Sequence, residues 1–163
     1  MEKTYPLEQL VKIKQRRLDE AERVLNETKE ALIKEEEKQK TLEKERDKTL
    51  KHRTDKLEQL RNELDRGTTT DKIEMMRDYL RVVEEQLSQE ERRVQDQVKE
   101  VKKAQKRVEE ARRDMIQKRC DVEKLLAHRK EWQKGIKRAI KYKEELETDE
   151  LGTSMHNLKK RKR

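Results

Sequence analysis

Apolar residues recur with a spacing of 3.5 along the second half of this sequence. Two interleaved series begin at Ile73 and Met76, step by seven residues, and end at Lys143 and Leu146. Of their 22 positions, 17 are apolar, although half of the chain is charged. An ordinary globular helix does not keep such a period for eleven heptads. The pattern therefore predicts a left-handed coiled coil, which requires a second helix with a matching seam.

The composition excludes a layered globular core. Of 163 residues, 29% are hydrophobic and 50% are charged, with one Pro, three Gly and no Phe. Such a chain forms either long helices or disorder, and the apolar period favours helices. No stretch approaches 18 apolar residues, and the opening MEKTYPLEQL lacks the apolar centre of a signal peptide. We therefore expect a cytoplasmic protein.

A second seam lies in the first half of the chain, and a short break separates it from the first. Apolar residues keep the 3.5 spacing from Leu7 toward Leu64, and Gly67 suits the left-handed residue that follows a helix. Thr70 or Asp71 is expected to cap the next helix. The prediction is an all-α fold: one antiparallel coiled-coil hairpin over residues 1–151, with helices at about 6–66 and 71–150, a loop at 67–70 and a flexible basic tail at 152–163.

The short loop also predicts the register of the two helices. Facing residues should have numbers that add up to about 137 near the loop and 136 farther away, because a stutter is expected between Arg46 and Leu50. Interruptions of the two seams then coincide: Arg46 falls opposite Glu90, and Gln39 falls opposite Gln97. Polar layers specify register at a cost in stability, so we expect the hairpin to be least stable there.

The predicted second helix is longer than the first, and it continues alone beyond about Trp132. It keeps an apolar face at Ile136 and Ile140, and an uncovered face of this kind usually meets a partner. Self-association is the alternative explanation. The same end is basic: residues 118–143 contain ten Lys or Arg and three Asp or Glu.

No catalytic or metal-binding constellation is present in the sequence. His52, His128 and His156 are scattered, Cys120 is the only cysteine, and there is no glycine-rich phosphate loop. The many carboxylates are expected on solvated helix faces, where nothing raises their pKa. We therefore expect a protein that is not an enzyme and has no cofactor or metal.

Two further surface features stand out. Met75, Tyr79 and Val82 fall outside the seam but share one helix face near the loop, either as a docking patch or as scattered surface residues. The tail KKRKR at 159–163 is a candidate contact for nucleic acid or an acidic partner. Because the rest of the chain is nearly neutral and lacks aromatic platforms, no nucleic-acid binding by the whole protein is expected.

The N-terminal sequence resembles a known family. The run Tyr5-Pro6-Leu7-Glu8-Gln9-Leu10-Val11-Lys12-Ile13-Lys14, followed by Arg17-Leu18-Asp19-Glu20-Ala21-Glu22, is similar to the opening of the YscO/SctO proteins of type III secretion, which are relatives of flagellar FliJ. The plan of two long helices in a hairpin is similar over the whole chain. The Tyr-Pro-Leu start with the Ile-Lys pair is the most specific part of the resemblance.

The resemblance implies a non-enzymatic, monomeric stalk at the cytoplasmic face of a secretion apparatus. Members of the family sit in the pore of a hexameric secretion ATPase, contact the export gate, and in some cases bind export chaperones. The residues then expected at the ATPase pore are Arg16, Arg17, Trp132, Lys134, Ile136, Lys137, Arg138, Ile140 and Lys141. Met75, Tyr79 and Val82 at the opposite end are expected to meet the gate.

Two other functions remain open from the sequence. One is a parallel homodimeric rod that serves as a scaffold or tether, with each helix pairing with its own copy. The other is a nucleic-acid-binding arm that acts through the basic tail, for which affinity would fall steeply with salt.

Overall fold

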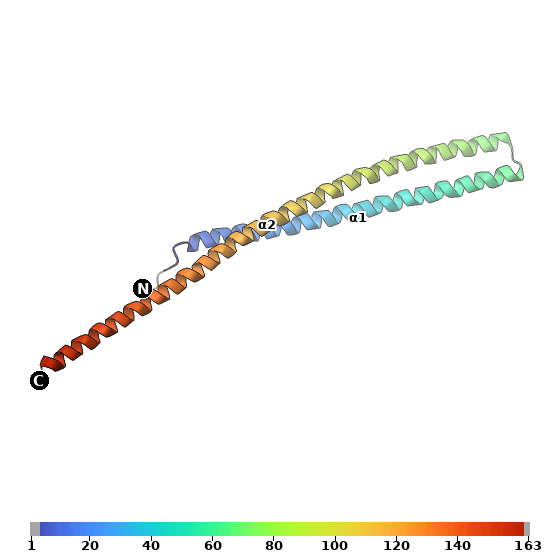
Figure 1. Ribbon diagram of the computed structural model, residues 1–163. Coiled ribbons are helices and arrows are strands. Elements are labelled where there is room, and N and C mark those ends of the chain that lie inside the picture. Colours follow the sequence, from blue (N-terminus) through green and yellow to red (C-terminus); the bar gives the residue numbers. More distant parts are fainter. Residues whose placement is uncertain (1–3, 162–163) are drawn as a thin grey trace. The chain divides into compact units, whose positions relative to one another are not determined.

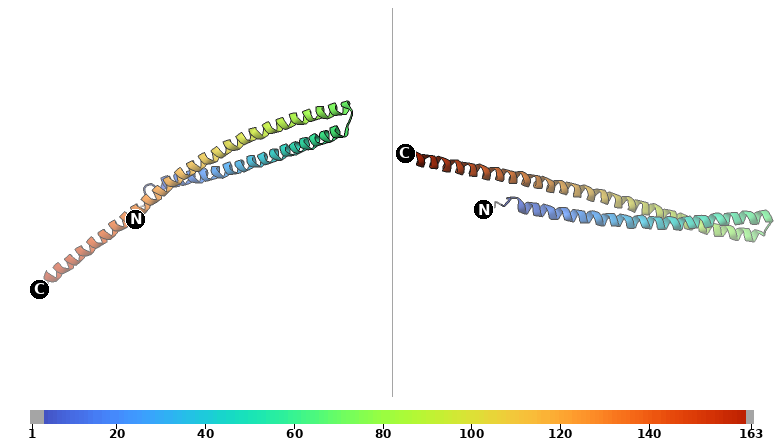
Figure 2. Two further views of the ribbon diagram at one scale, coloured as in Figure 1. Left: turned by 45° about the vertical axis from the view of Figure 1, so that its right-hand side comes forward. Right: turned by 90° about the horizontal axis from the view of Figure 1, so that it is seen from below.

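A computed structural model describes residues 4–161 and consists of two long helices (Figure 1). Helix α1 spans Glu8–Arg66 and helix α2 spans Thr70–Arg161. No strand occurs among the described residues. The helices run in opposite directions from the turn that joins them (Figures 1 and 2). This confirms the predicted all-α helical hairpin.

Residues 67–69 form the turn, and Gly67 is its key residue. Its φ is +75°, a left-handed conformation that costs glycine little because it has no Cβ. The Gly67 N–H donates to the carbonyl of Leu64 at 3.2 Å, one of the bonds that close a helix end. On the other side, the N–H of Ile73 donates to the carbonyl of Thr69 at 3.3 Å, so Thr69 precedes the helix. The expected cap at Thr70 or Asp71 was therefore one or two residues too late.

The chain divides into two compact units. The terminal unit combines residues up to Glu22 with Asp114–Arg163, and the turn unit is Arg23–Arg113. In each unit a segment of α1 packs against a segment of α2. The buried apolar side chains of the terminal unit are Tyr5, Val11, Leu18, Ala21 and Val122. Those of the turn unit are Leu25, Leu60, Leu80, Val83, Leu87, Val94, Val101 and Ala104.

The seam of α2 is buried as the 3.5 spacing predicts. Every position of the two heptad series from Ile73 to Ile136 is buried or half-buried. The next positions, Ala139, Lys143 and Leu146, are exposed. Burial of the seam therefore ends just beyond Trp132, where the first helix was expected to stop covering the second.

The seam of α1 differs from the prediction near the turn. Leu50 was placed inward by an assumed stutter, but it is 42% exposed, and Leu64 is 44% exposed. Thr49 is half-buried in place of Leu50, whereas Arg46 and Arg53 are half-buried as expected. These three positions keep the three- and four-residue steps of an unbroken coiled coil. The stutter is therefore wrong. The aliphatic stem of a long polar side chain can cover a seam, which a pattern of leucines does not reveal.

Ion pairs join the two helices on the flanks of the seam. In the terminal unit, Lys14 donates to Asp121 at 2.8 Å and Arg119 donates to Glu22 at 3.0 Å. In the turn unit, Arg53 donates to Glu84 at 2.9 Å, and their numbers add up to the expected 137. Such pairs contribute little stability at a surface, but they favour one register over its neighbours.

The polar layer lies in the turn unit, and its side chains do not all bond the residues expected to face them. Gln97 is half-buried and donates to both the carboxylate and the backbone carbonyl of Glu35, at 2.6 and 3.0 Å. Gln39 bonds Glu43 within α1 instead of Gln97. Arg46 bonds its neighbour Asp47 and not Glu90. Side chains as long as Arg and Gln reach several partners, so a facing position does not determine the bond.

The C-terminal part of α2 is longer than predicted. The helix was expected to end near residue 150, before Gly152, but it continues to Arg161. Gly67 is the only glycine with positive φ in the described chain, so Gly152 does not adopt the conformation that terminates a helix. The mobility of the predicted tail stays a prediction, and its last residues, 162–163, lie outside the described chain.

Candidate partner-binding surfaces

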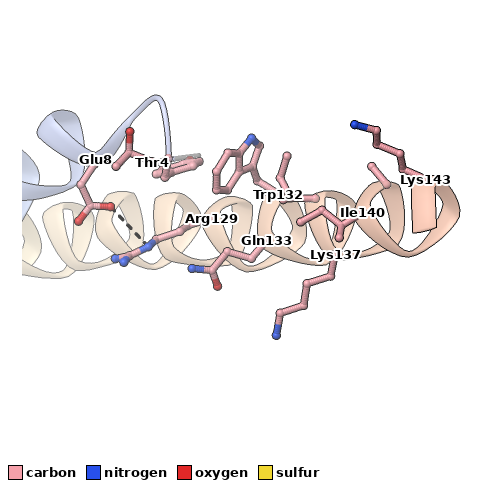
Figure 3. A pocket seen from close by; sticks show the side chains of 11 residues that line it. Thr4, Glu8, Arg129, Trp132, Gln133, Lys137, Ile140 and Lys143 are labelled. Carbon is pink, nitrogen blue, oxygen red and sulfur yellow. Dashed lines mark ion pairs between the residues drawn. The ribbon is translucent and has the colours of Figure 1, made fainter. Parts of the chain in front are cut away.

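Tyr5 joins the start of the chain to α2. It is only 6% exposed, and its hydroxyl lies 2.6 Å from Nδ1 of His128. Its ring meets that of Trp132 edge-on, with 5.5 Å between the ring centroids. Just beyond it, Glu8 pairs with Arg129 at 3.5 Å (Figure 3). We call Tyr5, His128 and Trp132 the tyrosine clasp.

The exposed part of α2 begins immediately after the clasp. We call residues 133–156 the arm, because no part of α1 covers them (Figure 1). Ile136 is half-buried, whereas Ile140 is 52% exposed and Leu146 is 45% exposed. An open hollow connects the clasp with the arm, lined by Thr4, Tyr5, Glu8, Arg129, Trp132, Gln133, Ile136, Lys137, Ala139, Ile140 and Lys143.

Cations surround this hollow. Figure 3 shows Trp132 and Lys143 on the same side of α2, with Lys137 pointing to another. Lys134 donates to Glu131 at 2.7 Å, and this hydrogen bond holds the pKa of the Glu131 carboxyl below its usual range. Lys137 and Arg138 are exposed. The surface therefore offers apolar contact beside positive charge, which suits an acidic partner with an apolar face.

The structure brings most of the predicted ATPase-contact residues onto the arm or its hollow. Trp132, Ile136, Lys137 and Ile140 line the hollow. Lys134, Arg138 and Lys141 are exposed on the same helix without lining it. Arg16 and Arg17 are exposed on α1 of the terminal unit and are not part of the hollow.

A second surface lies next to the turn. Met75 is 74% exposed, Tyr79 is 48% exposed and Val82 is 63% exposed, so all three predicted residues are open to solvent. Tyr79 contacts helix α1, because its hydroxyl lies 2.9 Å from Nε2 of His52 in that helix. A small hollow here is lined by Lys56, Gln59, Lys72, Met75, Met76 and Tyr79. Val82 does not line it.

Sequence reasoning missed the clasp. His128 was dismissed as an isolated histidine, yet it bonds Tyr5 across the hairpin. The numbers of Tyr5 and Trp132 add up to 137, which is within one of the 136 expected far from the loop. Extending this register to the first residues would have predicted the contact. Met76 and His52 were likewise not assigned to the surface near the turn.

Neither a metal site nor a membrane span occurs in the described part of the chain. Residues 4–161 contain no group of three His, Cys, Asp or Glu side chains that could hold a metal ion. None of the described helix is both long and apolar enough to cross a bilayer.

Comparisons with known proteins identify the family. The family model described as YscO-like protein matches residues 2–162. The solved structure of CT670 from Chlamydia trachomatis, described as a YscO homolog, is 41% identical to this chain. That match covers 99% of both chains with a TM-score of 0.90. No curated protein matches the sequence. The chain belongs to the YscO-like family of type III secretion proteins.

Proposed function

We propose that this protein is the non-enzymatic central stalk of a type III secretion ATPase complex. A single hairpin places its arm and tyrosine clasp in the pore of the ATPase hexamer at the cytoplasmic face of the apparatus. The surface near the turn contacts the export gate, and export chaperones are further candidate partners. In this role the stalk promotes assembly of the ATPase ring and couples its turnover to protein export.

The uncovered apolar stripe of the arm is the observation that carries the proposal. A coiled-coil helix normally loses its apolar stripe where its partner ends, but α2 keeps Ile136, Ile140 and Leu146 beyond the clasp. Exposed apolar stripes flanked by polar residues mark interaction sites. The basic residues beside the stripe favour a pore lined with acidic side chains.

The clasp supports the same assignment. A binding surface on a single helix needs a rigid base, because an isolated helical segment is marginally stable in water. Tyr5 provides this base by fixing Trp132 and His128 against the start of the chain. The apolar stripe of the arm therefore begins next to side chains that are already ordered by the clasp. This order lowers the entropy cost of binding.

ATP hydrolysis by the purified secretion ATPase tests the proposal. Adding the full chain is expected to raise the rate of hydrolysis. A variant with Ile136→Asp and Ile140→Asp, which places two charges in the stripe, should raise it little or not at all. The matched control carries Met75→Asp and Tyr79→Asp near the turn and should stimulate like the native chain. Equal stimulation by the arm variant, or none by the native chain, would refute the assignment.

A further inference from the structure

Charges on the arm are divided into two blocks of opposite sign. Residues 134–143 contain five basic residues and no acidic residue: Lys134, Lys137, Arg138, Lys141 and Lys143. Residues 144–150 contain five acidic residues and no basic residue: Glu144, Glu145, Glu147, Asp149 and Glu150. Residues 151–156 of the arm carry no Lys, Arg, Asp or Glu.

One apolar stripe crosses both blocks. Ile136, Ile140 and Leu151 lie within about a third of a turn of one another on an ideal helix, and Ala139 and Leu146 extend the stripe on one side. Ile140, Leu146 and Leu151 are 52%, 45% and 65% exposed. The arm therefore presents apolar surface over its basic block and over its acidic block, as one helix of a coiled coil does.

Ion pairs within the arm do not explain the two blocks. Lys141–Glu145 and Lys143–Glu147 are each 3.7 Å long and largely exposed. Both place the lysine before the glutamate, the weaker order for residues four apart. Among the described side chains, Arg138, Asp149 and Glu150 form no ion pair. Half of the ten charged side chains in the two blocks, including Lys137 and Glu144, are thus available to a partner.

We propose that the arm pairs in antiparallel orientation with the arm of a second copy of this chain. Antiparallel pairing places the basic block of each copy beside the acidic block of the other. Parallel pairing would place like charges together, which is unfavourable. The resulting interface is two-fold symmetric and closed, so it yields a dimer and not a filament.

The clasp limits the register of this dimer. Pairing begins beyond Trp132, because Tyr5 occupies that position of the seam within the same chain. Placing the centre of the basic block opposite the centre of the acidic block gives facing residues whose numbers add up to about 286. Lys141 then faces Glu145, and Ile140 faces Leu146. Charge selects the orientation, and the apolar stripe supplies the affinity.

The dimer also has a consequence that rests on the proposed function. It covers Ile136 and Ile140, which we assign to the ATPase, so a chain cannot bind both partners with its arm at once. The free protein would then be a dimer, and binding to the ATPase would separate the dimer into single hairpins. The experiments below contain no ATPase, so their outcome is separate from that of the hydrolysis assay.

Light scattering of the full chain over a range of concentrations tests the dimer. The native chain is expected to change from the mass of one chain to that of two as its concentration rises. An acidic-arm variant, with Lys137→Glu, Arg138→Glu and Lys141→Glu, should stay monomeric. Its dissociation constant should rise by about a hundredfold or more, because like charges now face one another. Circular dichroism verifies that helix content is unchanged.

The complementary variant makes this test specific. A basic-arm variant, with Glu144→Lys, Glu147→Lys and Glu150→Lys, should also stay monomeric alone. An equimolar mixture of the acidic-arm and basic-arm variants should restore the mass of two chains. A native chain that stays monomeric at all concentrations overturns the proposal, and so does a mixture that stays monomeric.

A matched control excludes a general effect of charge. Lys102→Glu, Lys106→Glu and Arg107→Glu change three exposed residues of α2 in the turn unit. This control should dimerise like the native chain. If it too becomes monomeric, the arm is not the interface.

Disulfide formation in a Cys120→Ser background tests the orientation. Cysteine at position 139 of one chain and at position 147 of another should link when the two variants are mixed. Cysteine at position 139 alone should not link to itself, because the two copies of Ala139 are about 12 Å apart along the axis of the antiparallel pair. Linkage of position 139 to itself would indicate a parallel pair and overturn the proposal.

Discussion

Tyr5 shows how one residue sets the boundary between a packed coiled coil and a free helix. It is the first buried side chain of the described structure, and it covers Trp132 where the seam of α2 loses its α1 partner. Its hydroxyl finds a partner in His128, as a buried phenol requires. The Tyr-Pro-Leu start that resembles the family thus has a structural role in this chain.

Replacing Tyr5 should open the start of the chain. Tyr5→Ala removes a buried ring, so local opening of this segment should become easier by about 3 kcal/mol. Tyr5→Phe should cost only about 1 kcal/mol, because it keeps the ring and loses the hydrogen bond. Trp132 is the only tryptophan, so its fluorescence reports the change. A red-shifted emission maximum is expected for Tyr5→Ala, and an unchanged spectrum would contradict the clasp.

Asp121 makes stability of the terminal unit depend on pH. The hydrogen bond from Lys14 holds the pKa of the Asp121 carboxyl below its ordinary value. A carboxyl whose pKa is lower in the folded than in the unfolded chain stabilises the fold above its unfolded pKa. This contribution is lost as the pH falls through the folded pKa.

Asp121→Asn therefore should lower the melting temperature at neutral pH and should reduce its decline between about pH 5 and pH 2. Thermal unfolding of both proteins across this range measures the difference. Parallel pH profiles for the two proteins would show that the Lys14–Asp121 pair does not contribute.

The turn between the helices depends on the conformation of Gly67. A Cβ at this position would meet no atom within 4 Å, so only the left-handed backbone opposes substitution. Gly67→Ala should therefore destabilise the hairpin by about 1–2 kcal/mol. Gly135→Ala is the control, since a Cβ there also meets open space and helical alanine is favoured by about 1 kcal/mol. Opposite shifts in thermal stability are expected, and equal shifts would contradict the role of the turn.

The polar layer of the turn unit contains one unsatisfied group. Glu90 occupies a seam position, and its Oε2 is buried without a hydrogen-bond partner. Glu90→Leu should raise stability by about 1 kcal/mol or more, because it replaces an unpaired carboxylate oxygen with apolar contact. Gln97→Leu is a comparison variant, which loses two bonds to Glu35 and should not gain as much. Destabilisation by Glu90→Leu in chemical unfolding would contradict this interpretation.

The two helices and the turn could be predicted from the sequence more reliably than the contacts between their side chains. Heptad spacing is enforced by burial, so the positions from Ile73 to Ile136 could be assigned from sequence, and Gly67 located the turn. Leu50 was misplaced because an apolar residue beside the seam looks like one within it. The bonds of Arg46 and Gln39 could not be predicted, because long flexible side chains choose among several partners at similar cost.

The candidate surfaces were predictable to a similar extent. An apolar stripe that continues without a partner is visible in sequence, and so are Met75, Tyr79 and Val82 outside the seam. The clasp required the register to be extended to the first residues. Arg16 and Arg17 lie away from the hollow because the helix turns them to solvent, which the resemblance alone did not indicate.

Each of the two compact units packs a segment of α1 against a segment of α2. The mixed charges on these helices suit a solvated surface. The two candidate surfaces differ in chemistry: methionine and tyrosine lie near the turn, whereas isoleucine and lysine lie on the arm. Two surfaces of different chemistry on one chain are what a protein needs to contact two different partners.

Site-specific photo-crosslinking to the purified secretion ATPase distinguishes the two ends. A photoreactive residue at position 140 on the arm is expected to link to the ATPase, and one at position 82 near the turn is not. Both positions are more than half exposed in the free chain, so unequal exposure cannot produce this difference. No link from position 140, or a link from position 82 in its place, would contradict the assignment of the arm to the ATPase.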